Sequence, residues 1–241
     1  MRSNKLLTSA TWPADCLEQL GKKYLISRGS IFNSERPEHF MMEVWNPLGT
    51  VGVISAFNFP NAVFGWNLAI ALICGNTVVW KGAPASSLIT IATGNVVSEV
   101  LKKNNINPNV FTVIQGDVEI GQAMSKDKRI PLLSFTGSSK VGAMVRSVVE
   151  QRFGKTLLEL GGNNATVVME DADLDMTLKA CVFGAVGTCG QRCTSLRRLY
   201  IHENIFDSFV EKMVKAYKTI KIGDPLDSET LCGPLNNLRS V

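Results

Sequence analysis

The chain has 241 residues, of which 45% are hydrophobic and 19% are charged, and its formal net charge is +4. This composition excludes a disordered protein, and the length suits one large α/β unit or one complete domain with part of another. No basic run and no patch of interleaved basic and aromatic residues points to nucleic acid, and the longest apolar stretches, such as residues 68–74, are too short to span a membrane.

Short apolar runs rich in β-branched residues alternate with helical stretches between residues 50 and 160. The expected strands are residues 50–56, 77–81, 110–115, 132–135 and 156–160, and the expected helices are residues 62–74, 86–104, 117–125 and 138–152. This alternation predicts an α/β fold with a Rossmann-like, mostly parallel sheet that carries helices on both faces. Ligands of such sheets bind beyond the carboxyl ends of the strands, where polar residues gather here: Asn58, Lys81, residues 136–138 and Glu159.

The pattern changes after Gly161 and Gly162. We expect a strand at residues 165–169, a helix from about residue 171 to 186, a glycine-rich loop, a strand at 198–202 and a helix at 205–219. No closing element follows before Val241, so this second α/β unit is expected to be incomplete, as in a fragment or a truncated relative of a longer protein.

Cysteine usage bears on the compartment. Six cysteines in a chain of this length are too sparse for a disulfide scaffold, and no secretory signal is visible, which favours a reducing compartment such as the cytoplasm. The first dozen residues contain Arg2, Lys5, several hydroxyl residues and no acid, as in a mitochondrial presequence, so mitochondria stay an alternative.

The loop at residues 187–195 contains Cys189 and Cys193. Zinc needs about four ligands, and the chain offers no second cysteine pair and only two histidines, so no metal site is predicted. The CxxxC spacing also differs from the CxxC of thioredoxin-type redox pairs. We expect Cys189, Cys181 and Cys74 to be small core residues. For Cys193 the preceding Arg192 and the surrounding N–H groups favour a thiolate, so a nucleophile and a core residue both remain open.

A carboxylate at the end of an apolar strand adds to this picture. Glu159 is followed by two glycines, which let another backbone approach closely. A thiol nucleophile and a lone carboxylate base suit chemistry that forms a thioester and then hydrolyses it. Partial burial of Glu159 would suit such a base, and the alternative is a surface or ion-paired glutamate.

Five motifs together resemble the aldehyde dehydrogenase superfamily over residues 34–234. They are AFNFP (56–60), WKGAP (80–84), FTGS (135–138), LELGG (158–162) and GQRCT (190–194). The segments GGNN (161–164), WKGAP and GWN (65–67) further resemble the family 7, antiquitin-like branch. Members of that branch oxidise α-aminoadipic semialdehyde, in lysine breakdown, and other aldehydes.

This resemblance implies NAD(P)-dependent oxidation of a small-molecule aldehyde to a carboxylic acid. Cys193 would attack the aldehyde carbon, giving a thiohemiacetal and then a thioester. Asn58 and the backbone N–H of Cys193 would stabilise the oxyanion. Glu159 would activate the water that cleaves the thioester. On spacing alone, Asn58 could equally be a turn residue.

The cofactor site has no GxGxxG fingerprint, and the glycines at 137 and 142 lack the Lys-Ser/Thr pair of a P-loop. They do mark a turn into a helix N-terminus, which suits a phosphate. The resemblance assigns Gly137 and Ser138 to the cofactor pyrophosphate and Lys81 to the adenosine ribose. It also places these residues at the cofactor: Ser55, Phe57, Leu160, Gly116 and Gly121.

Two positions bear on specificity. Pro84 stands where many NAD-preferring relatives carry a glutamate, so NAD is favoured and NADP stays open. Arg192 could bind a substrate carboxylate or pair with a protein acid.

The predicted domains are an unassigned segment (1–33), a Rossmann-like NAD(P)-binding domain (34–160) and a partial catalytic domain (161–241). Full-length relatives are expected to be homo-oligomers. The alternative functions are a catalytically silent nucleotide- or partner-binding remnant and a cysteine-dependent acyltransferase.

Overall fold

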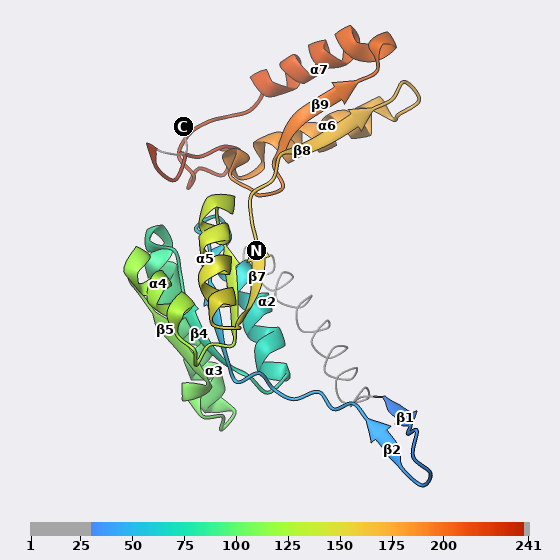
Figure 1. Cartoon of the computed structure of the whole chain (residues 1–241). Helices are drawn as coiled ribbons and strands as arrows, with labels where there is room; N and C mark the ends of the chain where they lie inside the picture. The colour runs from blue at the N-terminus through green and yellow to red at the C-terminus, as the bar shows by residue number, and fades with distance from the viewer. Residues whose placement is uncertain (1–29, 239–241) are drawn as a thin grey trace. The chain divides into compact units, whose positions relative to one another are not determined.

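The computed structural model describes residues 30–238 (Figure 1), so the presequence-like first dozen residues lie outside the described part. The chain divides into two compact units, with the boundary between Glu159 and Leu160. The assignment of cofactor binding to the first unit and catalysis to the second stays a prediction.

A five-stranded parallel sheet forms the centre of the first unit. Its strands follow the order β5-β4-β3-β6-β7. They are β3 (Thr50–Ile54), β4 (Thr77–Lys81), β5 (Phe111–Ile114), β6 (Leu132–Thr136) and β7 (Lys155–Glu159). Because the chain adds β4 and β5 on one side of β3 and then returns to place β6 and β7 on the other, the direction of winding reverses between β3 and β6. Ligands of open α/β sheets bind at such a switch point.

Helices cover both faces of this sheet, which confirms the predicted fold class. They are α2 (Pro60–Ile73), α3 (Ser87–Lys103), α4 (Val118–Lys126) and α5 (Ser139–Gln151). Alternate residues of β3 point to opposite faces. Val51 and Val53 pack in the cluster that includes α2, whereas a side chain at Gly52 would meet Met124 of α4.

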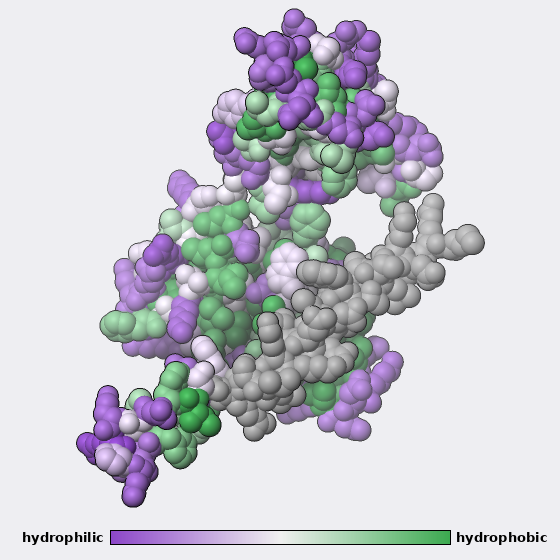
Figure 2. All heavy atoms as spheres, turned by 90° about the vertical axis from the view of Figure 1, so that its right-hand side faces the viewer, coloured by the Kyte–Doolittle hydropathy of each residue, from purple (hydrophilic) through white to green (hydrophobic). Residues whose placement is uncertain are grey.

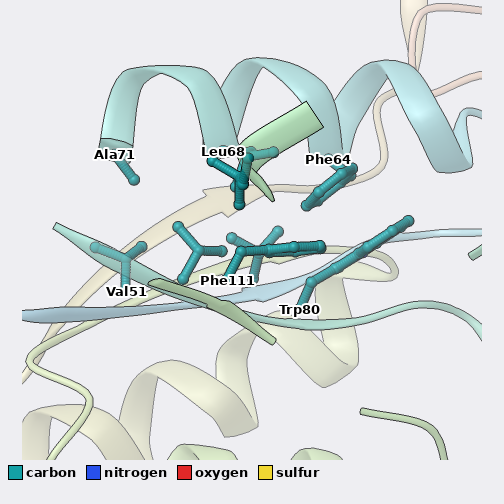
Figure 3. Close-up of a cluster of buried hydrophobic side chains, with 9 residues drawn as sticks. Val51, Phe64, Leu68, Ala71, Trp80 and Phe111 are labelled. Carbon is teal, nitrogen blue, oxygen red and sulfur yellow. The ribbon is translucent and has the colours of Figure 1, made fainter. Parts of the chain in front are cut away.

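The main core lies between α2 and the sheet (Figure 3). Phe64 of α2 stacks on Trp80 of β4, with ring centroids 3.6 Å apart and an interplanar angle of 8°. Phe111 of β5 lies beside both rings, and Leu68 and Ala71 continue the apolar stripe of the helix at the spacing that one helix face requires. This core holds the carboxyl ends of β3 and β4 in place.

The second unit begins as a βαβ unit. Strands β8 (Asn164–Val168) and β9 (Leu196–Ile201) pair in parallel, and helix α6 (Leu174–Val186) connects them before α7 (Phe206–Lys218). Val168, Cys181 and Phe209 form its buried cluster. The Asp173 side chain accepts hydrogen bonds from the N–H groups of Asp175 and Met176, so it caps the start of α6.

Some elements were not predicted from the sequence. Short 3₁₀ turns are η1 (Pro84–Ser86), η2 (Pro108–Val110), η3 (Gly187–Gly190) and η4 (Glu203–Ile205). An antiparallel hairpin pairs β1 (Ile31–Asn33) with β2 (Phe40–Met42), so the expected domain start at Ser34 falls in the turn of this hairpin. Figure 2 shows its hydrophilic tip and the exposed apolar side chains of its strands.

Candidate active site

The loop before β9 carries an exposed thiol on an anchored backbone. Cys193 is exposed, whereas Ser195, two residues later, is 2% exposed. The Ser195 N–H donates to the Arg192 carbonyl at 3.2 Å, and the Arg192 N–H donates to Ser195 Oγ at 3.1 Å. This reciprocal pair closes a tight turn around Cys193 and presents its side chain outward.

The GGNN segment supports the same loop. Asn164 Nδ2 donates to the Cys193 carbonyl at 2.7 Å and to the Ser195 carbonyl at 3.1 Å. A Cβ atom at Gly162 would lie 2.9 Å from the Cys193 carbonyl oxygen, so only glycine permits this approach. Gly162, Asn164 and Ser195 were not predicted as site residues. The GGNN motif is a family signature in the sequence, but its spacing does not predict a contact with the cysteine loop.

Arg192 lines a pocket within the second unit. Its Nε donates to Thr188 Oγ1 at 2.9 Å, and its guanidinium lies 5.1 Å from the centre of the Phe183 ring. The pocket has a volume of about 520 Å³, and Lys179 and Leu231 also line it. Two cationic side chains beside apolar walls suit a ligand that carries a negative charge at one end.

The expected core cysteines differ from one another. Cys181 is 2% exposed, and burial raises the pKa of its thiol, as expected of a core residue. Cys74 and Cys189 are only half-buried, so the prediction of burial is wrong for both. Cys74 stands at the carboxyl end of α2, and Cys189 lies in η3.

Lys81 and Ser55 meet at the carboxyl edge of the sheet. Lys81 ends β4, is 5% exposed, and its Nζ donates to the Gly82 carbonyl at 3.3 Å. Burial lowers the pKa of its ammonium group, and the negative charges of Asp117 and Glu119 oppose that shift. Ser55 donates its N–H to the Lys81 carbonyl, and its hydroxyl accepts from Trp80 Nε1 at 2.9 Å. The Ser55 hydroxyl therefore has a structural partner in Trp80.

The glycines at this edge have different constraints. Gly116 follows β5 with φ +147°, and a Cβ there would lie 2.3 Å from Ile120 Cγ1. A Cβ at Gly137, which follows β6, would lie 2.6 Å from Phe135 Cζ. Gly121 lies within α4, where a Cβ would make only an ordinary contact, at 3.8 Å from Ile54. Close packing therefore requires glycine at 116 and 137 but not at 121.

Ser138 stands at the start of α5, as the sequence predicted for a phosphate-facing turn. Its Oγ accepts from the Val141 N–H at 3.3 Å, so the hydroxyl caps the helix. The preceding Gly137 donates its N–H to the Glu159 carbonyl at 3.1 Å, which ties the ends of β6 and β7 together. The turn between β6 and α5 is thereby held at the switch-point edge.

The remaining predicted residues lie on loops or strand ends. Asn58 and Phe57 follow β3 and are half-buried, and Asn58 Oδ1 accepts from the Phe59 N–H at 3.1 Å. Glu159 ends β7 and is exposed, so the expected partial burial is not found. Leu160 is half-buried at the start of the second unit. Asn58 and Glu159 thus belong to the first unit, and Cys193 belongs to the second.

Two further polar side chains lie at the carboxyl edge: Thr136, in the polar turn at residues 136–138 that the sequence indicates, and Gln115, which the sequence analysis does not assign to the site. The hydroxyl of Thr136 and the amide of Gln115 are buried and have no hydrogen-bond partner among residues 30–238. Thr136 ends β6, and Gln115 directly follows β5. Buried polar groups without partners are costly in a folded protein, so they mark places where a polar ligand would find partners.

The described residues show neither a metal cluster nor a membrane-spanning helix. Residues 30–238 contain no group of three or more His, Cys, Asp or Glu side chains that could hold a metal ion. Over the same residues, no helix is both long enough and apolar enough to cross a membrane.

Comparison with known proteins identifies the family. The model of the aldehyde dehydrogenase family matches residues 8–241, so the chain belongs to this family. The curated relatives it matches include aldehyde dehydrogenase family 7 member A1 of Malus domestica, 59% identical, and α-aminoadipic semialdehyde dehydrogenase of Bos taurus, 52% identical. Each match covers 88% of this chain but only 42% and 40% of the relative, respectively. The family 7 resemblance of the motifs is thus confirmed.

Solved structures agree. A glyceraldehyde-3-phosphate dehydrogenase from Methanocaldococcus jannaschii, complexed with NADP, matches with a TM-score of 0.85 and 31% identity over 94% of this chain and 49% of its own. A betaine aldehyde dehydrogenase from Staphylococcus aureus, in complex with NAD⁺, matches with a TM-score of 0.82 and 28% identity over 88% of this chain and 41% of its own.

Proposed function

We propose that this chain carries the cofactor-binding and nucleophile-bearing parts of an NAD(P)-dependent aldehyde dehydrogenase, which oxidises an aldehyde to a carboxylic acid. The observation that carries the proposal is the exposed Cys193 thiol on a loop whose backbone is held by Asn164 and Ser195. The chain spans about two-fifths of the length of the curated relatives it matches, so the activity of the whole protein is part of the proposal.

Cys193 is the proposed nucleophile. Its thiolate attacks the aldehyde carbon, forming a carbon–sulfur bond and a thiohemiacetal alkoxide. Loss of a hydride from that carbon leaves a thioester, which is the oxidised product still bound to Cys193. The loop supports this role because a fixed backbone orients the thiol before the substrate arrives.

Asn58 and Glu159 complete the proposed chemistry. The Asn58 side-chain oxygen accepts from Phe59, which orients the amide nitrogen as the donor side for the alkoxide. Glu159 takes a proton from the water that attacks the thioester carbon, and the carbon–sulfur bond then breaks to release the acid and the Cys193 thiolate. The exposure of Glu159 leaves its carboxylate open to water.

The carboxyl edge of the first unit fits a dinucleotide. When bound, NAD(P) would accept the hydride that leaves the substrate carbon. Gly137 and Ser138 would bind its pyrophosphate at the start of α5, and Lys81 its adenosine ribose. Ser55, Phe57, Gly116, Gly121 and Leu160 are the further proposed contacts. The Thr136 hydroxyl and the Gln115 amide, which find no partner in the described part of the chain, support this placement because both lie at the same edge. NAD is favoured and NADP stays open.

Arg192 and its pocket suggest the substrate class. An aldehyde with a distal carboxylate, such as α-aminoadipic semialdehyde, would bring a negative charge to a pocket lined by Arg192 and Lys179. The curated relatives that bear the name α-aminoadipic semialdehyde dehydrogenase support this choice. We further propose a homo-oligomer for the whole protein and a cytoplasmic location, with mitochondria as the alternative.

The first experiment mixes the purified 241-residue chain with NAD and α-aminoadipic semialdehyde and follows the absorbance of the reduced cofactor. We expect turnover that disappears in Cys193→Ala. Far-UV circular dichroism verifies that both proteins are folded, and cofactor binding is measured separately. A folded chain that binds NAD without turnover would support the silent-remnant alternative. Acyl transfer without any cofactor binding would support the acyltransferase.

A second experiment tests Arg192. We expect Arg192→Ala to raise KM for the carboxylate-bearing aldehyde by about 10- to 150-fold, the equivalent of a charge-assisted hydrogen bond of about 1.5–3 kcal/mol. For a simple alkyl aldehyde of similar length the change should be small. Equal losses on both substrates would overturn the carboxylate role.

A further inference from the structure

Cys189 has an unusual place in the second unit. Thr188 and Cys189 both adopt left-handed backbone conformations, with φ of 56° and 54°. This turn aims the Cys189 side chain at a segment far along the chain, where its Sγ donates to the Gly233 carbonyl at 3.2 Å across 44 positions of sequence. Left-handed conformations are costly for residues other than glycine, so the tertiary contacts of this turn must hold it.

Cys232 is held on the facing segment by its own backbone. It forms an isolated parallel bridge with Ile222, its carbonyl accepts from the Gly223 N–H at 3.1 Å, and its N–H donates to the Lys221 carbonyl at 3.2 Å. The Cys189 thiol reaches the carbonyl of Gly233, the residue next to Cys232, and the Cys232 thiol is close enough to interact with the Cys189 thiol. Both cysteines are half-buried, so small solutes can reach the pair.

A second contact joins the same two segments. The Asn236 N–H donates to Gln191 Oε1 at 2.9 Å. The segment around Cys232 therefore runs along the loop that leads to Cys193, with the Cys189–Gly233 contact at one end and the Gln191–Asn236 contact at the other.

We propose that Cys189 and Cys232 form a redox site, in which a peroxide converts the two neighbouring thiols into a reversible disulfide that ties the 221–233 segment to the loop before Cys193. No function of either cysteine is needed for the proposed dehydrogenase reaction. The inference therefore stands apart from that reaction.

The electron balance needs one peroxide for each disulfide. The Cys189 thiolate attacks one oxygen of hydrogen peroxide, forming a sulfenic acid and releasing hydroxide, which takes a proton to become water. Cys232 then attacks the Cys189 sulfur, the sulfur–oxygen bond breaks, and a second water leaves. Two electrons and two protons pass from the thiols to the peroxide. A small-molecule dithiol reverses the step by exchange.

Physical reasons favour Cys189 as the attacking thiol. The interaction with the neighbouring Cys189 thiol and burial together raise the pKa of Cys232 to about 11, so Cys232 keeps its proton at neutral pH. Cys181 is an unsuitable partner because it is buried in the core between α6 and α7. Cys193 is exposed in a separate turn, whose backbone Asn164 and Ser195 hold.

The test treats the reduced, folded 241-residue chain with one equivalent of hydrogen peroxide, caps remaining thiols with N-ethylmaleimide and maps the peptides by mass spectrometry. Cys193→Ser is mapped in parallel, so that the exposed thiol does not compete for peroxide. We expect one linked peptide pair, joining Cys189 to Cys232, with a mass lower by two hydrogen atoms. Dithiothreitol should reverse it, and its yield should not depend on protein concentration.

Three variants sharpen the result. Cys189→Ser and Cys232→Ser should each abolish the linked pair, whereas Cys181→Ser, the matched control from the same unit, should retain it. Circular dichroism verifies the fold of each variant. If a variant does not fold, the peptide map of the unsubstituted chain tests the proposal without it. The proposal is overturned if Cys189 and Cys232 remain fully alkylated while Cys193 is oxidised, if Cys189 links to Cys193 in comparable yield, or if the link forms only between chains.

Discussion

Replacing Gly162 by alanine should displace the loop that carries Cys193. The added Cβ would lie 2.9 Å from the Cys193 carbonyl oxygen and 3.1 Å from Asn164 Oδ1, whereas ordinary contacts begin near 3.4 Å. Relief requires the loop to move by about half an ångström, against the hydrogen bond from Asn164. Overpacking of this kind costs about 1–3 kcal/mol. We therefore expect Gly162→Ala to lower the free energy of unfolding by about that amount.

The same shift should reach the Cys193 thiol. A misplacement of about 1 Å can cost about a hundredfold in rate, so half that distance suggests about a tenfold loss of turnover. Urea unfolding followed by far-UV circular dichroism measures the stability, and alkylation of Cys193 by iodoacetamide, read by mass spectrometry, reports its reactivity. Where turnover is measurable, its kcat should fall with the reactivity.

Gly184 supplies a matched control in the same unit. A Cβ there would lie 3.5 Å from Leu196 Cβ, an ordinary contact, and the position is inside α6. Alanine should therefore leave Cys193 reactivity unchanged and stabilise the helix by about 0.5–1 kcal/mol. If Gly162→Ala is as stable as Gly184→Ala, and Cys193 is alkylated at the same rate in both, then the close contact of Gly162 with the Cys193 carbonyl does not affect stability or reactivity, and the reasoning is refuted.

Three further predictions concern single contacts. Asn164→Ala removes the donor of two loop carbonyls and should lower the free energy of unfolding in urea by about 1–3 kcal/mol, whereas Asn163→Ala, which retains the backbone carbonyl bonded to Arg198, should change it by under about 0.5 kcal/mol. Ser55→Ala leaves Trp80 Nε1 buried without its acceptor and should cost about 1–3 kcal/mol, seen as a lower urea midpoint in tryptophan fluorescence; an unchanged midpoint would contradict it. The rate of Cys232 alkylation should rise with pH with a midpoint near 11 rather than 9.0. Because the folded-state pKa of Cys232 is raised, the stability that this thiol contributes is complete below pH 9.0 and is lost as the pH approaches 11. An alkylation midpoint near 9.0 would refute this prediction.

Most of the sheet could be predicted because its strands are buried and apolar. Strand β4 has the predicted bounds, Thr77–Lys81, since β-branched residues and Trp80 fill a site covered by α2. Strand β3 ends at Ile54, two residues before the predicted end. Apolar character continues through Ala56, but the ladder to β4 stops at the Ile54–Lys81 pair. Periodicity identifies a strand, and its end depends on the partner strand.

The hairpin of β1 and β2 could not be predicted in the same way. Each strand has only three residues, all of them exposed, so neither shows the alternation of buried and exposed positions that a longer strand would show. No apolar face is buried to set its register. Its existence rests on backbone pairing between Ile31 and Met42, which leaves no pattern in the sequence.

The same distinction between local pattern and long-range pairing applies to the residues of the candidate site. Residues at the ends of strands, such as Lys81 and Gly137, could be placed at the carboxyl edge from sequence, because parallel strands bring their ends together. Contacts across long sequence separations could not. Asn164 and Cys193 are 29 positions apart, and nothing in either motif states that a side-chain amide of one bonds the backbone of the other.

The cysteine loop explains why these two motifs belong together. A loop outside regular structure must still satisfy its backbone polar groups. Here side chains do so: Asn164 donates to the Cys193 and Ser195 carbonyls, and Ser195 Oγ accepts from the Arg192 N–H. The thiol can then be exposed on a backbone that is fixed, a combination that a nucleophile needs and a mobile loop cannot provide. Since Gly162 leaves room for this approach, the glycine–asparagine segment and the cysteine turn act as one structural element, and substitutions in either should affect the same thiol.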